Sequence, residues 1–381
     1  MTRIYMDYAA TTPLCREAWE AMTAANRSFG NPSSPYEEGR AARAVLDQSR
    51  RTMQQLIGAA QPREVIFTGG GSESDALAIC GYARRNRSMG NHIITSAIEH
   101  HAVLHACEAM KKEGFRVTVL SVDAEGFVHP QILLDALDDE TILVSIQLAN
   151  NEIGTIQAVE KLAAIAHDRG AAFHCDAVQA FGSLPVDVQA LGVDLLSLSA
   201  HKFYGPRGVG VLYLRQGVAI EPLIYGGQQE QGVRAGTENV MGIAGMVVAA
   251  ERAEHIREAE NARLQALQDQ LIEAVLTQIP ESRLNGSRNR RLVGNVHFSF
   301  GGVNREALLM RLDLAGLSAS AGSACASGTL EPSHVMTAIG ADDGAPLRLS
   351  MGMHTNAEEV AGVVEILQTV IQELREKETK K

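Results

Sequence analysis

Short apolar runs alternate with helical patterns between about residues 60 and 215, and this alternation limits the folds that are open to the chain. Strands separated by helices usually run parallel, because each helix carries the chain back across the sheet before the next strand begins. The pattern therefore predicts an α/β fold with a mostly parallel central sheet and flanking helices. The predicted strands are residues 64–68, 92–96, 115–122, 142–148, 171–176 and 194–199, with a further apolar strand at about 208–214.

Later segments predict a second, smaller layer of structure. It comprises a long helix, two strands and a closing amphipathic helix, at residues 237–279, 294–300, 346–351 and about 357–376. The chain has 381 residues, of which 45% are hydrophobic, so it is long enough for a large core and two domains.

Composition excludes several classes of partner and location. The formal net charge of −11 argues against nucleic acid as the main partner. No apolar run approaches the roughly 18 residues of a membrane span, and the N-terminal segment lacks the apolar core of a signal peptide. The five scattered cysteines fit neither a disulfide framework nor a metal site. We therefore expect a soluble, reduced, cytoplasmic protein.

Polar motifs follow the predicted strands at the edge where such sheets bind ligands. The turn "GGGSES" leads into a helix N-terminus, and it is either an anion cradle or a tight turn. A helix would place His101 and His105 on one face, but no third metal ligand is near, so acid–base chemistry or ring stacking by a histidine is favoured over zinc. Asn150 and Asn151 indicate no more than a turn in isolation.

The most informative motif follows the strand at 194–199, which runs directly into His201 and Lys202. A lysine enclosed by apolar sequence loses its charge readily, and the neutral amine can attack a carbonyl to form a Schiff base. Asp176 ends the neighbouring strand, either as a helix cap or as the buried partner of a cation. Pyridoxal phosphate needs a lysine that forms a Schiff base with its aldehyde, a carboxylate for its ring nitrogen, a phosphate cradle and a surface over its ring. These features occur together here and predict pyridoxal phosphate as the cofactor.

A separate motif, "SASAGSACASG" at residues 318–328, surrounds Cys325 with small residues only. It is either a linker that contains a cysteine or a loop whose thiol can reach a reaction partner. The other cysteines are expected to be packing residues.

At this point the chain resembles the NifS/IscS-type cysteine desulfurases. The shared motifs occur in the family's order over nearly the whole chain: "YMDYAATTP", "NPSS…GR", "FTGGGSES", "IEHHAV", "ANNEIGTIQ", "HCDAVQ", "SAHKFYGPRGVG", "RAGTEN", "SAGSAC" and "LRLSMG". The resemblance implies a homodimeric fold-type I enzyme with a large cofactor domain at 15–250. The small domain would combine residues 1–14 and 251–381 and carry the cysteine loop at about 318–332.

The resemblance also implies roles for single residues. Lys202 would form the Schiff base, Asp176 would pair with the pyridinium nitrogen, and His100 would stack on the ring and carry protons. Gln179 would bond the phenolic oxygen of the cofactor. The phosphate group would be held by Gly71, Ser72, Ser199, His201 and, from the other subunit, Thr237.

For the substrate, the resemblance places Asn150 beside the cofactor and the carboxylate of L-cysteine, and Arg348 would grip that carboxylate in a two-pronged bond. Cys325 would take the sulfur as a persulfide, leaving L-alanine, and pass it to acceptor or scaffold proteins for iron–sulfur cluster assembly, tRNA thiolation or other sulfur transfer. The resemblance implies no resident metal, although Cys325 could transiently ligate a nascent iron–sulfur cluster.

Departures from the family pattern leave alternatives open. Tyr36 stands where the family often has histidine, Ser72 where threonine is usual, and Met353 where many relatives have arginine. The C-terminus also lacks the longer tail with which IscS-like members dock scaffold proteins. A selenocysteine lyase and a sulfur-delivery scaffold with weak catalysis are the alternative functions. A transaminase is disfavoured because it needs no loop nucleophile such as Cys325.

Overall fold

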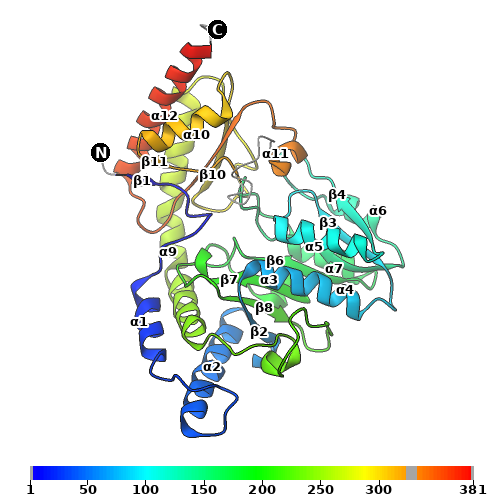
Figure 1. Ribbon diagram of the computed structural model, residues 1–381. Helices are drawn as coiled ribbons and strands as arrows, with labels where there is room; N and C mark the ends of the chain where they lie inside the picture. The colour runs from blue at the N-terminus through cyan, green and yellow to red at the C-terminus, as the bar shows by residue number, and fades with distance from the viewer. Residues whose placement is uncertain (1–2, 323–332, 379–381) are drawn as a thin grey trace.

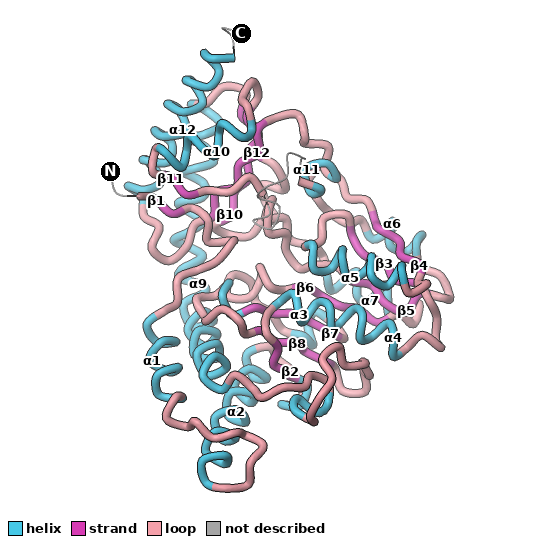
Figure 2. The backbone as a smooth tube through the Cα atoms, viewed as in Figure 1, coloured by secondary structure: helices cyan, strands magenta, loops and turns pink. Residues whose placement is uncertain are grey.

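The computed structural model describes residues 3–322 and 333–378, and its centre is a seven-stranded sheet in the order β2-β8-β7-β6-β5-β3-β4 (Figures 1 and 2). The five strands from β7 to β4 run parallel, whereas β8 runs antiparallel to both neighbours. The predicted α/β fold and all its strands in this region are confirmed. The strands are β2 Val65–Thr68, β3 His92–Ser96, β4 Arg116–Leu120, β5 Thr141–Ser145, β6 Ala172–Asp176, β7 Leu195–Ser199 and β8 Gly210–Leu214.

Alternate residues of the strands enter two different cores, because successive side chains point to opposite faces of a sheet. Leu195 and Leu212 pack with the helices that follow β2 and β3, whereas Leu196 and Val211 join a larger cluster with α7 and α9. Both faces are therefore covered, which explains the uniformly apolar strands. The helices and 3-10 turns of this part are α1 Arg16–Ala25, α2 Glu37–Leu56, η1 Pro62–Glu64, α3 Gly71–Ala76, α4 Tyr82–Arg85, α5 His101–Lys112, α6 Pro130–Ala136, α7 Val159–His167, α8 Val188–Leu191, η3 Ala200–Lys202 and η4 Gln229–Gly232; between α3 and α4 lies the π-helical turn η2 Leu77–Gly81.

Helix α9, Val240–Gln278, runs from this core into a second one (Figure 1). Its first half contributes Ala249 and Ala250 to the large cluster, and its second half contributes Leu264 and Leu271 to a cluster that also contains Met6. The second core thus combines both ends of the chain, and the division into a large and a small domain stays a prediction. Its other elements are β1 Ile4–Tyr5, β9 Ser282–Leu284, β10 Asn295–Phe300, α10 Arg305–Leu314, β11 Leu317–Ser318, α11 His334–Ala338, β12 Ala345–Ser350 and α12 Ala357–Glu378.

Strands β9, β10 and β12 form an antiparallel sheet, with His297 opposite Arg348 in the β10–β12 ladder. Strand β1 pairs in parallel with β11, so the N-terminal segment lies against the small domain before it enters the large one. Within the described ranges, no helix combines the length and apolarity needed to cross a bilayer.

Candidate active site

A cavity of about 210 Å³ lies where β6 and β7 end at the carboxyl edge of the sheet. Its lining residues come from the seven-stranded sheet region and from strand β12, which contributes Arg348. Nine of the predicted site residues meet there: Gly71, Ser72, His100, Asp176, Gln179, Ser199, His201, Lys202 and Arg348.

Lys202 lies in η3, immediately after β7, and the N-terminal segment fixes its side chain. The Lys202 Nζ donates to the carbonyl oxygens of Ala9 at 2.7 Å and Ala10 at 2.9 Å. Two residues later, Tyr204 has a φ of 67°, a strained value for a residue with a bulky side chain. Its N–H donates to Thr12 Oγ1 at 2.8 Å, so the N-terminal segment also holds this turn.

Asp176 ends β6, and its carboxyl lies at the floor of the cavity. Oδ1 accepts the N–H of Val178 at 2.9 Å, and the side chain is buried. Burial raises the pKa of Asp176 to about 6, whereas the Val178 N–H and the charge of Lys202 oppose this rise. A cation placed beside Asp176 would therefore favour its ionised form.

His100 is the N-cap of α5, where its Nδ1 accepts the N–H of Ala102 at 3.2 Å. Burial, followed by the charge of Lys202, lowers the pKa of His100 to about 4. The ring is therefore neutral near pH 7, and the contact with Ala102 assigns its hydrogen to Nε2. A neutral, flat ring suits stacking, as the sequence predicts.

One end of the cavity lies at the start of α3, where Glu73 in the first turn is paired with Arg234 at 2.8 Å. Gly71 begins α3, and a Cβ there would lie 2.7 Å from Val178 Cγ2, so the close approach requires glycine. Ser72, Ser199 and His201 line the same end. The helical stretch continues from α3 through η2 and α4 to Arg85, and its first backbone N–H groups are free for an anion.

Arg348 is 1% exposed, and its guanidinium is held in the cavity from two sides. Its Nη2 forms an ion pair with Asp7 Oδ1 at 2.8 Å, and its Nη1 donates to the carbonyl oxygen of Asn151 at 3.1 Å. The Nε has no hydrogen-bond partner among the described residues. An oriented, buried guanidinium of this kind can bind a carboxylate.

Two predicted site residues lie elsewhere, and a third falls outside the described residues. The side chain of Asn150 is used locally, since Nδ2 donates to Ile98 and Oδ1 accepts from Glu152 and Ile153, and it does not line the cavity. Thr237 is exposed and outside the cavity of its own chain. Cys325 lies outside the described residues. Their predicted roles stay predictions.

Other residues of the cavity were not singled out from the sequence. Asp75 and Gln147 line it, as do Ala9 and Ala10 of the N-terminal segment. The motif "YMDYAATTP" marked that segment without assigning roles to its residues, and the position of Asp75 just after the glycine-rich turn was the available signal.

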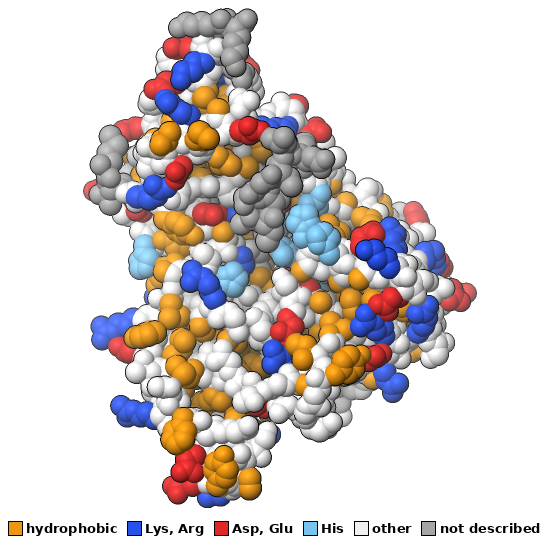
Figure 3. Space-filling view, viewed as in Figure 1, with side chains coloured by type: hydrophobic (Ala, Val, Ile, Leu, Met, Phe, Trp, Pro, Cys, Tyr) orange, Lys and Arg blue, Asp and Glu red, His pale blue; other side chains and the backbone are white. Residues whose placement is uncertain are grey.

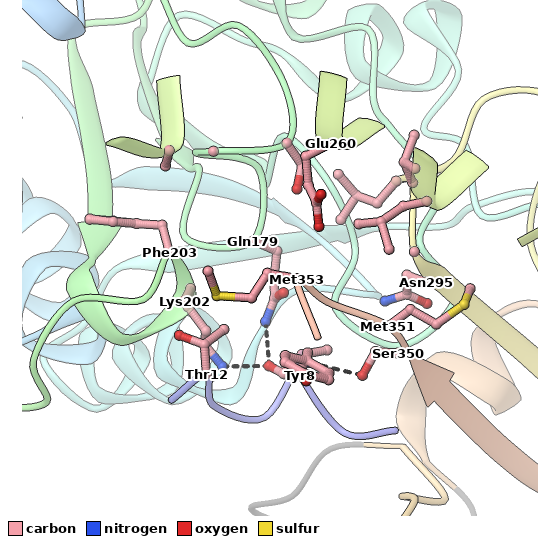
Figure 4. A pocket seen from close by; sticks show the side chains of 18 of the residues that line it. Tyr8, Thr12, Gln179, Lys202, Phe203, Glu260, Asn295, Ser350, Met351 and Met353 are labelled. Carbon is pink, nitrogen blue, oxygen red and sulfur yellow. Dashed lines mark hydrogen bonds between the residues drawn. The ribbon is translucent and has the colours of Figure 1, made fainter. Parts of the chain in front are cut away.

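A second cavity shares Ala9, Gln179 and Lys202 with the first and extends to α9 and β12 (Figure 4). Met353, one of the departures from the family pattern, lines this second cavity, and its N–H donates to the Tyr204 hydroxyl at 2.9 Å. Tyr36, another departure, is a half-exposed surface residue at the start of α2.

Histidine side chains also gather on the surface over α5 and α11 (Figure 3). The rings of His101 and His105 are stacked with centroids 5.3 Å apart, and His334 lies 4.6 Å from His101. Across residues 3–322 and 333–378, no three His, Cys, Asp or Glu side chains are arranged to hold a metal ion.

Comparison with known proteins identifies the family. The model of the class-V aminotransferases matches residues 4–363. The curated "Cysteine desulfurase IscS" of Dictyoglomus turgidum is 49% identical over 98% of this chain and 95% of its own. This chain belongs to the NifS/IscS family of class-V aminotransferases.

Solved structures of this family share the fold as well. A "NIFS-LIKE PROTEIN" superposes with a TM-score of 0.92 at 32% identity, covering 98% of this chain and 100% of that chain. The structure "SspA in complex with cysteine" superposes with a TM-score of 0.80 at 35% identity, covering 91% of this chain and 98% of that chain. The NifS/IscS fold is thus present over nearly the full length.

Proposed function

We propose that the protein is a pyridoxal-phosphate-dependent cysteine desulfurase that converts L-cysteine to L-alanine and receives the sulfur on Cys325 as a persulfide. The observation that carries the proposal is the single cavity in which nine predicted residues from five separate stretches of the chain meet. The relatives named cysteine desulfurase and the related SspA with bound cysteine support the choice of substrate.

The residues present fit pyridoxal phosphate. Gly71, Ser72, Ser199 and His201 would hold the phosphate at the end where a Cβ on Gly71 would be in the way, and Lys202 would hold the aldehyde carbon. The remaining contacts would come from Asp176 at the ring nitrogen, His100 on the ring face and Gln179 at the phenolic oxygen. When bound, the cofactor supplies an electron sink for the substrate carbon.

The chain itself would bind the substrate and transfer its sulfur. Arg348 would hold the carboxylate of L-cysteine through charge-assisted hydrogen bonds. His100 would carry protons at the ring face; burial, followed by the charge of Lys202, lowers its pKa to about 4, so its ring is neutral near pH 7 and would hold an added proton only during a transfer. The Cys325 thiolate would attack the substrate sulfur, so that the S–S bond forms as the C–S bond breaks and the carbon product takes up a proton.

The proposal extends to the setting of the reaction. We propose that the enzyme acts as a homodimer in the cytoplasm and delivers the persulfide sulfur to acceptor or scaffold proteins. Thr237 of each subunit would complete the phosphate site of the other.

Cys325→Ser tests the proposed function. A serine hydroxyl attacks sulfur far more weakly than a thiolate, so alanine production from L-cysteine should fall by orders of magnitude. The wild type, incubated with L-cysteine and no reductant, should gain one sulfur on the Cys325 peptide in a mass spectrum. Cys15→Ser is the matched control, because Cys15 is the N-cap of α1, where serine is well tolerated, and lies outside the cavity.

That control should keep both alanine production and the persulfide at Cys325. Alanine and sulfide release by Cys325→Ser at the wild-type rate would show that this cysteine is not the nucleophile.

A further inference from the structure

In and beside the cavity lie two buried carboxyls for which the proposed function has no role. Asp75 of α3 is 1% exposed and lines the cavity, and Glu99, just before α5, is completely buried. Both carboxyls interact electrostatically with Asp176, the predicted partner of the ring nitrogen. Three negative charges in one buried space would be strongly unfavourable.

Within residues 3–322 and 333–378, no Lys or Arg forms an ion pair with Asp75. Among the described residues, the basic group within ion-pair distance is His174 on β6, with 3.7 Å between its Nε2 and Asp75 Oδ1. His174 is fully buried, and its ring nitrogens lie 2.8 Å from Ser145 Oγ and 3.0 Å from Ser197 Oγ. Burial lowers the pKa of His174 to about 3, so its ring is neutral.

Hydrogen bonds do not compensate a charge on Asp75 either. The Ser197 hydroxyl bonds to its side chain, but Oδ1 has no hydrogen-bond partner within the part of the chain that the structure describes. An ionised carboxylate normally accepts several hydrogen bonds or pairs with a cation when it is buried. The surroundings of Asp75 therefore suit a protonated carboxylic acid.

The other titratable groups near Asp75 do not stabilise a negative charge on its carboxyl either. An ionised Glu99 would add a further negative charge near Asp75, but burial raises the pKa of Glu99 to about 8, so its carboxyl is neutral near pH 7. The Cys175 thiol is neutral because burial raises its pKa. The charge of Lys202 acts on Asp176, where it favours the ionised form. For Asp75, burial and then the charge of Asp176 raise the pKa well above its usual value.

We propose that Asp75 holds a proton and thereby leaves Asp176 as the single charged carboxylate at the floor of the cavity. Asp75 is then a positioning residue, which acts through Asp176 on the affinity for a protonated ring nitrogen. The inference rests on the proposed function in this one respect, that Asp176 meets the cofactor. The proton on Asp75 itself does not depend on the cofactor.

Infrared spectroscopy of protein labelled with 13C at the aspartate carboxyl tests the proton directly. At neutral pH the wild type, both as isolated and after removal of pyridoxal phosphate, should show an isotope-shifted band of a protonated carboxyl. Asp75→Asn should lack this band. The matched control is Asp194→Asn, which should keep the band, because Asp194 pairs with His167 at 2.7 Å and with Arg215 at 3.4 Å.

Absence of the shifted band from the labelled wild type would overturn the proposal. Because this measurement uses the wild type alone, it does not depend on whether a variant folds. A band that survives in Asp75→Asn would assign the proton to another aspartate and would also overturn it. A protein that shows the band but fails to bind pyridoxal phosphate would contradict the proposed function alone.

A second measurement tests the effect on the cofactor. As pH rises, ionisation of Asp75 should add a second negative charge near the protonated ring nitrogen, so the wild type should retain pyridoxal phosphate to higher pH than a variant without that charge; release is followed by the absorption of the cofactor in equilibrium dialysis. Asp75→Asn cannot ionise, and its release midpoint should lie at least about one pH unit lower. Asp75→Glu keeps a titratable group and should restore the wild-type midpoint. Identical midpoints for the wild type and Asp75→Asn would contradict the positioning role.

Discussion

Arg348 reaches its position through contacts from distant parts of the chain. Asp7, 341 residues earlier, forms its ion pair, and the carbonyl oxygen of Asn151 accepts from its other Nη. The pair with Asp7 compensates the buried charge while no substrate is present, and it sets the plane of the guanidinium. The geometry thus prepares Arg348 for a carboxylate without leaving its charge unpaired.

We predict that Arg348→Ala mainly harms substrate capture. Truncating one member of a buried, charge-assisted pair costs about 2–5 kcal/mol, so kcat/KM for L-cysteine should fall by at least about 30-fold, chiefly through KM. Steady-state kinetics of alanine formation measures this effect. Arg283→Ala is a control in the same domain, because Arg283 pairs with the exposed Asp343 and should leave the kinetics unchanged. An unchanged KM in Arg348→Ala would show that the carboxylate is held elsewhere.

Glu99 provides a pH-dependent contribution to stability. It is fully buried, and burial raises its pKa to about 8, although Ser96 Oγ and the Gln147 N–H bond its carboxyl. Because the folded-state pKa lies above the unfolded value, its contribution is fully present below about pH 4.5 and is lost as pH rises towards 8. The wild type should therefore lose stability across this window.

Glu99→Gln should remove that loss, because the amide oxygen can accept from Gln147 and the amide nitrogen can donate to Ser96. The difference in the free energy of unfolding between the variant and the wild type should shift in favour of the variant by about 1.4 kcal/mol for each pH unit between 5 and 8. Urea denaturation of protein without added cofactor measures it. The exposed Glu251→Gln should run parallel to the wild type. A pH-independent difference for Glu99→Gln would rule out the raised pKa.

At the scale of single elements, the turn between β2 and α3 forms one wall of the predicted phosphate site. Gly71 lies against Val178 of the segment after β6, so two strand ends approach closely because one residue has no side chain. The Ser199 Cβ would lie 3.3 Å from a Cβ on Gly71, so β7 also meets this point.

Gly71→Ala should therefore weaken the binding of pyridoxal phosphate. Overpacking of this kind costs about 1–3 kcal/mol, which corresponds to a rise in Kd of roughly 5- to 150-fold. The double variant Gly71→Ala, Val178→Ala removes the clashing methyl groups and should recover part of that affinity, with Val178→Ala alone as the control. Fluorescence titration with the cofactor measures all three. A Kd of Gly71→Ala equal to that of the wild type would argue against this cradle.

The strands of the central sheet were predictable from local sequence, whereas the way in which the elements pair with one another was not. The strands from β2 to β8 were found because each is an apolar run bounded by polar or glycine-rich residues, and Lys202 and Asp176 stood out because they end such runs. The antiparallel direction of β8, the π-helical turn η2 and the pairing of β1 with β11 have no local signal.

The same limit applies to the site. Asp75 has an ordinary place in a helix, and only the fold brings it beneath Asp176. Asn150 shows a related case: the resemblance implies a role beside the cofactor and substrate, which stays a prediction, and its side chain bonds Ile98, Glu152 and Ile153. Such contacts depend on tertiary structure and cannot be derived from spacing.

At the scale of the whole molecule, the described chain has features that a second copy would complete. The active-site cavity shares Ser72 and His201 with a neighbouring cavity, which Arg207 also lines. Thr237 is exposed and lines neither of these two cavities. Large apolar side chains are also exposed, with Trp19 at 61% and Phe29 at 81%. A partner subunit that supplies Thr237 would cover surface of this kind.

We predict that Thr237 acts in the partner's site, and mixed dimers can test this directly. Thr237→Glu puts a negative charge opposite the phosphate and should abolish cofactor binding in a homodimer, whereas Lys202→Ala removes the attachment point. In a mixed dimer of these two chains, one site combines an intact Lys202 with an intact Thr237 from the other chain. Heterodimers purified with two different tags should therefore show about half of the wild-type activity per dimer. Action of Thr237 in its own chain would leave both sites defective and the mixed dimer inactive. An active monomer in light scattering would contradict the homodimer itself.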